Sequence, residues 1–123
     1  NKVQEAIEKW SDIKNEYPNI KLHLIGRLQT NKVKFAIKIF DYIHSVDNEK
    51  LAKKISEEQS KQNKKIKIFI QVNLAEEKQK SGVSKLDLED FYKYCKNRYA
   101  KSKSFVKQVL YCNAQLYFEV RVS

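Results

Sequence analysis

Apolar residues recur every three or four positions in four stretches of the chain, which is the spacing of an amphipathic helix. The first stretch comprises Val3, Ala6, Ile7, Trp10 and Ile13. It is followed by Asn15, Pro18 and Asn19, which predict the end of that helix. The other three stretches comprise Val33, Ala36, Ile37 and Phe40, then Leu51, Ala52 and Ile55, then Leu88, Phe91 and Cys95.

Residues that cap helices stand in front of the three later stretches. Thr30 is expected to cap the second helix and Asp47 the third, because hydroxyl and carboxylate oxygens accept hydrogen bonds from free backbone N–H groups. Ser84 and Asp87 have the spacing of an S-x-x-D capping box before the fourth helix. The caps predict where the helices begin, whatever the function of the protein.

Strands are predicted between the helices, where apolar and polar residues alternate or apolar residues run together. They cover residues 20–25, 42–46 and 66–74. In the third strand, IKIFIQVNL, the even positions are apolar and Phe69 adds an apolar residue to the other face. A strand that is buried on both faces is typical of a parallel sheet covered by helices. The order α-β-α-β-α-β-α therefore predicts an α/β fold.

The pattern changes near residue 98. Residues 98–104 are basic and linker-like, and the following residues have no helical period. Apolar and polar residues alternate from 116 to 122, which favours a terminal strand or hairpin. We therefore expect two parts, residues 1–97 with the α/β pattern and residues 98–123 as a divergent tail.

Charge narrows the functional classes only slightly. The 123 residues include 25 basic and 15 acidic side chains, giving a net charge of +10, which attracts anions from phosphate esters to nucleic acid. The lysines are spread along the chain, which favours solvated helix faces over a nucleic-acid surface. The two cysteines are too few for a disulfide framework and are expected to be reduced in the cytoplasm. No apolar run reaches the ~20 residues that span a bilayer, so no membrane association is expected.

Ligands of parallel α/β sheets bind at the carboxyl ends of the strands. Here these ends carry residues 26–30, 44–47 and 71–73, followed by Lys80, Ser81 and Gly82. Helix starts beside them suit anions. His23 and His44 lie in separate strands without clustered carboxylates or thiols, so no metal site is predicted. No nucleophilic catalytic set can be placed, and the pattern alone does not identify the ligand.

Several strings identify a family resemblance that covers residues 1 to about 97. NKVQEAIEKW, LHLIGRLQTNKVK, IHSVD, IQVN and EEKQKSGV resemble, in this order and at the right separations, the pyridoxal phosphate homeostasis protein family. That family has a barrel similar to the N-terminal domain of alanine racemase. The resemblance therefore implies a partial (β/α)₈ barrel of the TIM type, with about three to four βα units.

The resemblance also implies a cofactor and the residues that hold it. The cofactor is pyridoxal 5'-phosphate (PLP), which the family buffers in the cytoplasm without a settled catalytic reaction, so we do not expect an enzyme. The residues expected to bind the cofactor are Asn1, His23, Gly26, Thr30, Ser45 and Asn73. Further matches to the ends of the family's strands are Leu28, Gln29, Asn31, Lys32, Asp47, Gln71, Lys80, Ser81 and Gly82.

Two family features have no match in these residues. The family's Schiff-base lysine lies on a strand that would precede Asn1, and its Gly-Ser-Thr phosphate-binding segment lies near its C-terminus. We therefore expect an internal fragment of a PLP-binding protein that does not form the Schiff base itself and that self-associates through open sheet edges. Two alternatives stay open: a small basic nucleic-acid-binding module, and a non-functional truncated remnant.

Overall fold

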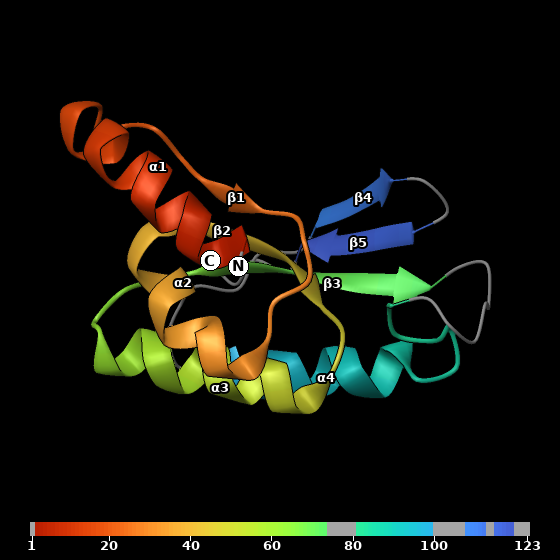
Figure 1. Cartoon of the computed structure of the whole chain (residues 1–123). Helices are drawn as coiled ribbons and strands as arrows, with labels where there is room; N and C mark the ends of the chain where they lie inside the picture. The colour runs from red at the N-terminus through yellow and green to blue at the C-terminus, as the bar shows by residue number, and fades with distance from the viewer. Residues whose placement is uncertain (1, 74–80, 100–107, 113–114, 120–123) are drawn as a thin grey trace.

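The computed structural model describes residues 2–73, 81–99, 108–112 and 115–119. Within these residues, helices alternate with strands, and the helices pack side by side against the sheet (Figure 1). The helices are α1 (Lys2–Glu16), the short 3₁₀ helix η1 (Thr30–Lys32), α2 (Val33–Ile39), α3 (Glu49–Lys61) and α4 (Leu88–Tyr99). The strands are β1 (His23–Leu24), β2 (Tyr42–Val46), β3 (Lys67–Asn73), β4 (Gln108–Cys112) and β5 (Gln115–Glu119).

The first three strands are parallel neighbours. His23 of β1 is paired with Tyr42 of β2, and Tyr42 is paired with Lys67 of β3. A helical segment connects each strand to the next, with η1 and α2 between β1 and β2 and α3 between β2 and β3. The predicted mixed α/β arrangement around parallel strands is therefore confirmed.

The core lies between the three parallel strands and the helices. The fully buried side chains include Ile37 of α2, Ile55 of α3, and Ile68, Ile70 and Val72 of β3. On the other face of β3, Phe69 is also buried, with 3% of its surface exposed. The prediction that this strand is buried on both faces is confirmed, because apolar residues occupy both of its faces.

Three local predictions are wrong. The strand expected over residues 20–25 is only His23–Leu24, because Ile20 and Lys21 precede the ladder with β2. Thr30 does not cap a helix by its side chain but begins η1. Asp47 does not cap α3, since the cap is Asn48, whose side-chain oxygen accepts from the Leu51 N–H at 2.8 Å. The adjacent Asp47 and Asn48 are equally suited to capping, and the carboxylate of Asp47 has another partner, described below.

The expected capping box before α4 does form. The Ser84 hydroxyl oxygen accepts from the Asp87 N–H at 3.2 Å, and the hydroxyl donates to the Asp87 carboxylate at 2.9 Å. α4 begins at the next residue and buries Phe91 and Cys95. Burial and the nearby Glu49 carboxylate raise the pKa of the Cys95 thiol, so this cysteine stays protonated and is not a nucleophile.

The last two strands differ in direction from the first three. β5 pairs with β3 in antiparallel orientation, and β4 pairs with β5 in the same way, giving the strand order β1-β2-β3-β5-β4 (Figure 1). A (β/α)₈ barrel contains only parallel strands. The parallel arrangement therefore extends over β1, β2 and β3, and β5 pairs with the other edge of β3 in the opposite direction.

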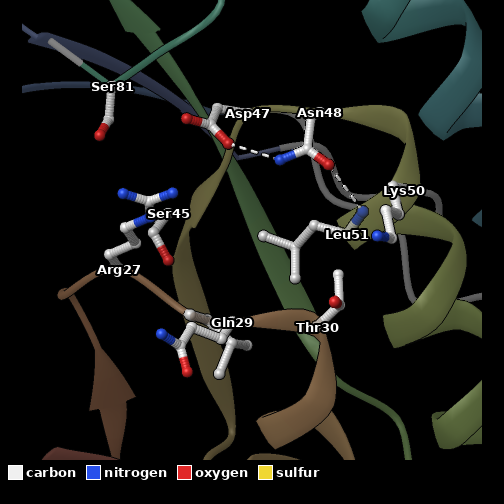
Figure 2. Close-up of a pocket in the computed structure, with 10 residues that line it drawn as sticks. Arg27, Gln29, Thr30, Ser45, Asp47, Asn48, Lys50, Leu51 and Ser81 are labelled. Atoms are coloured by element: carbon white, nitrogen blue, oxygen red, sulfur yellow. Dashed lines mark hydrogen bonds between the residues drawn. The ribbon is translucent and has the colours of Figure 1, made fainter. Parts of the chain in front are cut away.

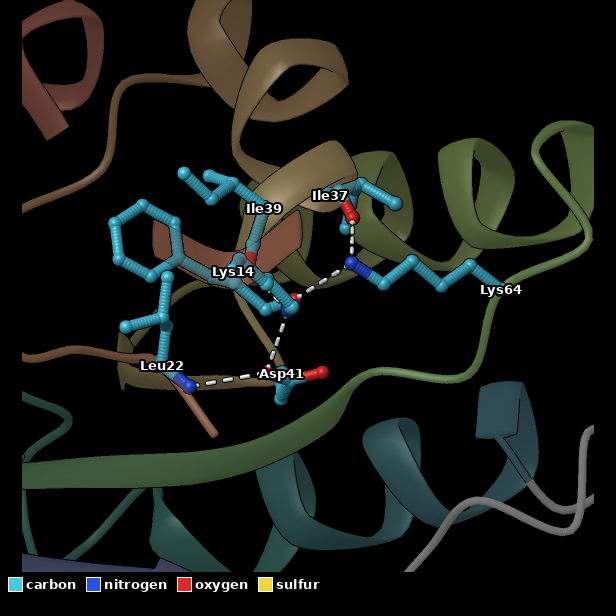
Figure 3. Close-up of polar contacts among 7 residues, drawn as sticks. Lys14, Leu22, Ile37, Ile39, Asp41 and Lys64 are labelled. Atoms are coloured by element: carbon cyan, nitrogen blue, oxygen red, sulfur yellow. Dashed lines mark hydrogen bonds and ion pairs between the residues drawn. The ribbon is translucent and has the colours of Figure 1, made fainter. Parts of the chain in front are cut away.

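Polar contacts of Lys14 and Asp41 connect α1 to the segments that precede β1 and β2 (Figure 3). The Lys14 ammonium donates to the Asp41 carboxylate at 2.7 Å and to the Ile39 carbonyl at 2.7 Å, and the Leu22 N–H donates to Asp41 at 3.0 Å. Burial tends to raise the pKa of Asp41, but the hydrogen bonds from Lys14 and Leu22 and the nearby ammonium charges outweigh it and lower that pKa.

We expect Asp41→Asn to lower the free energy of unfolding at pH 7 by about 2 kcal/mol, because a half-buried ammonium loses its anion. The wild-type contribution should be present above about pH 4, the ordinary carboxyl pKa, and should be lost as the pH falls through the lower pKa of the folded state. Urea unfolding at pH 7 and pH 3 measures both effects. Asp12→Asn removes an exposed carboxylate from α1 and is the control; an equal loss in both variants would contradict the proposed role of the Asp41 contacts.

Candidate functional site

A polar pocket of about 470 Å³ lies where β1 and β2 end, at the edge at which parallel sheets bind ligands (Figure 2). We call it the mouth pocket. Its residues come from the loop after β1, the start of η1, the end of β2, the start of α3 and the segment before α4. They are Arg27, Leu28, Gln29, Thr30, Ser45, Asp47, Asn48, Lys50, Leu51 and Ser81.

Ser45 is the buried polar residue of this pocket. Only 6% of its surface is exposed, and its hydroxyl has no hydrogen-bond partner among the residues that the structure describes. The pairing of β2 with β3 is irregular between Ile43 and Val46, and Ser45 lies within that irregular stretch. Because buried hydroxyl groups normally have a partner, this one is available for a ligand.

Positive groups surround the opening of the mouth pocket. Arg27 and Lys50 line it from two different elements, and both are exposed. The amino-terminal end of α3, beginning at Glu49, also faces this edge of the sheet (Figure 2). Backbone N–H groups at a helix start carry partial positive charge. The pocket therefore suits an anionic or strongly polar ligand.

Asp47 joins the ends of two strands at the mouth pocket. One of its carboxylate oxygens accepts from the Gly82 N–H at 3.0 Å, and the other accepts from the Asn48 side-chain amide at 2.9 Å. Next to Gly82, the Val83 N–H donates to Gln71 and the Val83 carbonyl accepts from the Asn73 N–H, both at 2.8 Å. The segment that starts at Ser81 is thus fixed against β3.

The two histidines form a pair that the sequence analysis missed. His23 Nδ1 and His44 Nε2 lie 2.9 Å apart. Their rings also stack on aromatic neighbours, His23 on Tyr42 at 4.0 Å and His44 on Phe69 at 3.9 Å between ring centroids. His23 of β1 is paired with Tyr42 of β2, and His44 follows Tyr42 by two residues, so the side chains of all three lie on the same face of the sheet. Knowledge of this strand register would have predicted the contact between the two histidines.

Protonation of His44 is unfavourable. Burial, and to a smaller extent the charge of His23, lowers the pKa of His44 to about 4. Near neutral pH His44 is therefore a neutral imidazole. One ring then donates an N–H to the other, which accepts it.

The structure brings some of the residues predicted to bind the cofactor together and separates others. Thr30 and Ser45 share the mouth pocket. Gly26 lies in the loop leading to it, and Asn73 is buried at the end of β3. His23 is instead paired with His44 and stacked on Tyr42. Asn1 and Lys80 lie outside the described residues.

The described part of the chain contains neither a candidate metal site nor a candidate membrane-spanning helix. No three histidine, cysteine, aspartate or glutamate side chains there are grouped to hold a metal ion. None of the described helices is long and apolar enough to cross a membrane.

No protein-family model matches the sequence. Curated relatives are found, however, and they carry the name pyridoxal phosphate homeostasis protein. The chain is 37% identical to the protein of Aquifex aeolicus over 94 residues, 76% of this chain and 40% of the relative. It is 32% identical to that of Pasteurella multocida over 97 residues, 79% of this chain and 42% of the relative. The chain thus spans about two fifths of the length of these relatives.

Solved structures lead to the same family. PipY of Synechococcus elongatus without PLP superposes with a TM-score of 0.71 at 34% identity, over 79% of this chain and 45% of PipY. PipY with PLP bound gives a TM-score of 0.62 at 31% identity, over 76% of this chain and 42% of PipY. Sequence and structure thus agree over more than three quarters of the chain, and over this part the chain is similar to proteins of the pyridoxal phosphate homeostasis family.

Proposed function

We propose that this chain forms part of a PLP-binding site in a protein of PLP homeostasis. The observation that carries the proposal is the similarity to PipY with PLP bound, at 31% identity over 76% of the chain. In this proposal β1, β2 and β3 with their helices are consecutive units of a partial barrel. PLP lies at the carboxyl ends of these strands, with Thr30, Ser45 and Asn73 among the residues closest to it.

The chemistry of the mouth pocket fits this cofactor. PLP carries a phosphate, a phenolic oxygen and a ring nitrogen, and it supplies an electrophilic aldehyde when bound. The Ser45 hydroxyl is buried and without a described partner, and Thr30 provides a second hydroxyl in the same pocket. Arg27 and Lys50 supply charges opposite to that of the phosphate. Asn1 and Gly26 are proposed contacts by resemblance, and so is His23 at the amino-terminal side of the same loop.

Binding by these 123 residues is proposed to be non-covalent. By resemblance, the lysine to which the family attaches PLP belongs to a strand that has no counterpart among the matched residues. Lys50, the lysine among the residues that line the mouth pocket, is exposed, and an exposed ammonium is not activated by burial. The proposal therefore separates binding of the cofactor from covalent attachment.

We expect PLP to be retained in equilibrium dialysis, and we expect borohydride reduction followed by peptide mass spectrometry to label exposed lysines at low and scattered occupancy. Pyridoxal without phosphate, dialysed in parallel, is the matched control and should be retained less. Retention that is equal for both compounds would contradict binding through the phosphate. A stoichiometric adduct at a single lysine would contradict the non-covalent mode.

A further inference from the structure

The mouth pocket contains a buried hydroxyl group that has no hydrogen-bond partner among the described residues. Ser45 is 94% buried, and its hydroxyl has no hydrogen-bond partner among the described residues. A buried hydroxyl without a partner is unfavourable in the empty protein. Its position on the wall of an open pocket indicates that a ligand accepts or donates the missing hydrogen bond.

The charges around Ser45 define the class of that ligand. Arg27 lies on the same side of the pocket as Ser45, and Lys50 lies across from them on the first turn of α3 (Figure 2). A guanidinium group presents a planar fork of N–H donors that matches two oxygens of a phosphate. An ammonium opposite it supplies a second positive charge. This arrangement is selective for a compact anion with several oxygens.

The start of α3 adds backbone donors to this arrangement. Asn48 caps the helix by accepting from the Leu51 N–H, so the first-turn N–H groups of Glu49 and Lys50 are not used by that cap. The helix has 13 residues, long enough for a developed dipole. A phosphate at the pocket opening would thus meet side-chain and backbone donors from two directions.

The carboxylate of Asp47 would repel an anion in the pocket, but hydrogen bonds from its neighbours partly offset its negative charge. Asp47 is the acidic side chain among the residues that line the pocket. Its two oxygens already accept hydrogen bonds from Gly82 and Asn48. The positive charges of Arg27 and Lys50 outnumber the single carboxylate, so the pocket keeps an excess of positive charge.

From the unpartnered Ser45 hydroxyl between two cations and a helix start, we infer that the mouth pocket is a binding site for a phosphate group. The inference rests on the proposed function, because it concerns the same pocket. It adds that these residues bind a phosphate group by themselves, without the Gly-Ser-Thr segment that the resemblance places near the family's C-terminus. A titration with inorganic phosphate separates the two proposals, since phosphate can bind here whether or not PLP does. The ligand is inorganic phosphate or the phosphate of a small monoester, and both present the same oxygens.

The test is a calorimetric titration of the 123-residue chain with inorganic phosphate at constant ionic strength, with chloride as the reference anion. We expect saturable binding at one site. Arg27→Gln should weaken it about tenfold, because a charge-assisted bidentate contact is lost. Lys96→Gln removes one positive charge from an exposed position on α4 outside the pocket and should leave phosphate binding unchanged.

The substitution Ser45→Ala tests whether the Ser45 hydroxyl contacts the ligand or serves only the stability of the fold. We expect it to weaken phosphate binding several-fold while the thermal midpoint of the phosphate-free protein stays equal or rises, because an unsatisfied buried hydroxyl is removed. Competition by PLP for the same site would assign it to phosphate monoesters, and lack of competition would assign it to free phosphate. Absence of saturable binding, or equal weakening by Arg27→Gln and Lys96→Gln, would overturn the inference.

Discussion

Gly82→Ala is expected to lower the free energy of unfolding by about 3 kcal/mol. Gly82 has a φ of 116°, which side-chain-bearing residues rarely adopt. A Cβ at this position would lie 2.6 Å from the Asn73 nitrogen and 2.9 Å from the Val72 carbonyl carbon, both of which belong to the backbone of β3. Since neither atom can move without disturbing the ladder, the segment of Gly82 must leave the strand.

Its displacement would also break the contacts that shape the mouth pocket. The Gly82 N–H would lose the Asp47 carboxylate, and the paired hydrogen bonds of Val83 with β3 would lengthen. Gly26→Ala is the matched control, because a Cβ there meets nothing within 4 Å, and we expect a change within about 0.5 kcal/mol. Urea unfolding at pH 7 compares the two variants; similar stability of both would contradict the close approach to β3.

The histidine pair is expected to make the protein lose stability between pH 6.5 and pH 4. The pKa of His44 is about 4 in the folded state and 6.5 in an unperturbed histidine, so only the unfolded state takes up the proton in this range. The His44 contribution to stability is therefore fully present above pH 6.5, falls as the pH decreases, and causes no further change below about pH 4. The shift corresponds to at most about 3 kcal/mol, and partial solvent exposure of the ring makes the observed loss smaller.

His44→Gln should remove most of this pH dependence, because glutamine does not titrate. Urea midpoints at pH 7, 5.5 and 4.5 report the slope, and ring proton shifts in NMR report the pKa of His44 directly. The acid range of Asp41 lies lower, so the two effects can be separated. An unchanged slope in His44→Gln, or a His44 pKa near 6.5, would show that the pair is not responsible.

The local spacing of apolar residues was sufficient to predict the positions of the helices and of the central strand β3. The apolar spacing from Val3 to Ile13 matches the helix observed as α1, because a helix that packs one face on a sheet must repeat its apolar residues at helical spacing. Alternation and an apolar second face correctly identified β3 as buried on both sides. These features depend on residues close in sequence, and sequence patterns report them well.

Features that depend on distant residues were predicted poorly. Asp47 and Asn48 are both good caps, and what separates them is the hydrogen bond from Gly82, 35 residues away from Asp47. The strand expected over residues 20–25 is short because pairing with β2 begins only at His23. The His23–His44 contact likewise follows from strand register. The pattern of apolar and polar residues therefore predicted the edge of the sheet at which the mouth pocket lies, but it did not predict how the side chains are arranged in that pocket.

The resemblance supplied the cofactor, which no local pattern could. Residues matched to the family lie at the ends of all three parallel strands, yet among the predicted cofactor residues that the structure describes, only Thr30 and Ser45 line the mouth pocket. The antiparallel direction of β5 could not be predicted from the sequence either, because alternation of apolar and polar residues is the same in parallel and antiparallel strands.

The central proposal is that PLP binds at the carboxyl ends of the parallel strands. The most direct measurement is a titration of the ¹⁵N-labelled chain with PLP, followed by amide chemical shifts in two-dimensional NMR. We predict that the largest saturable shifts occur at Thr30, Ser45 and Gly82, with small shifts on the exposed faces of α1 and α4. Absence of saturable shifts at these three amides, or shifts confined to the lysine-rich helix faces, would contradict the proposal.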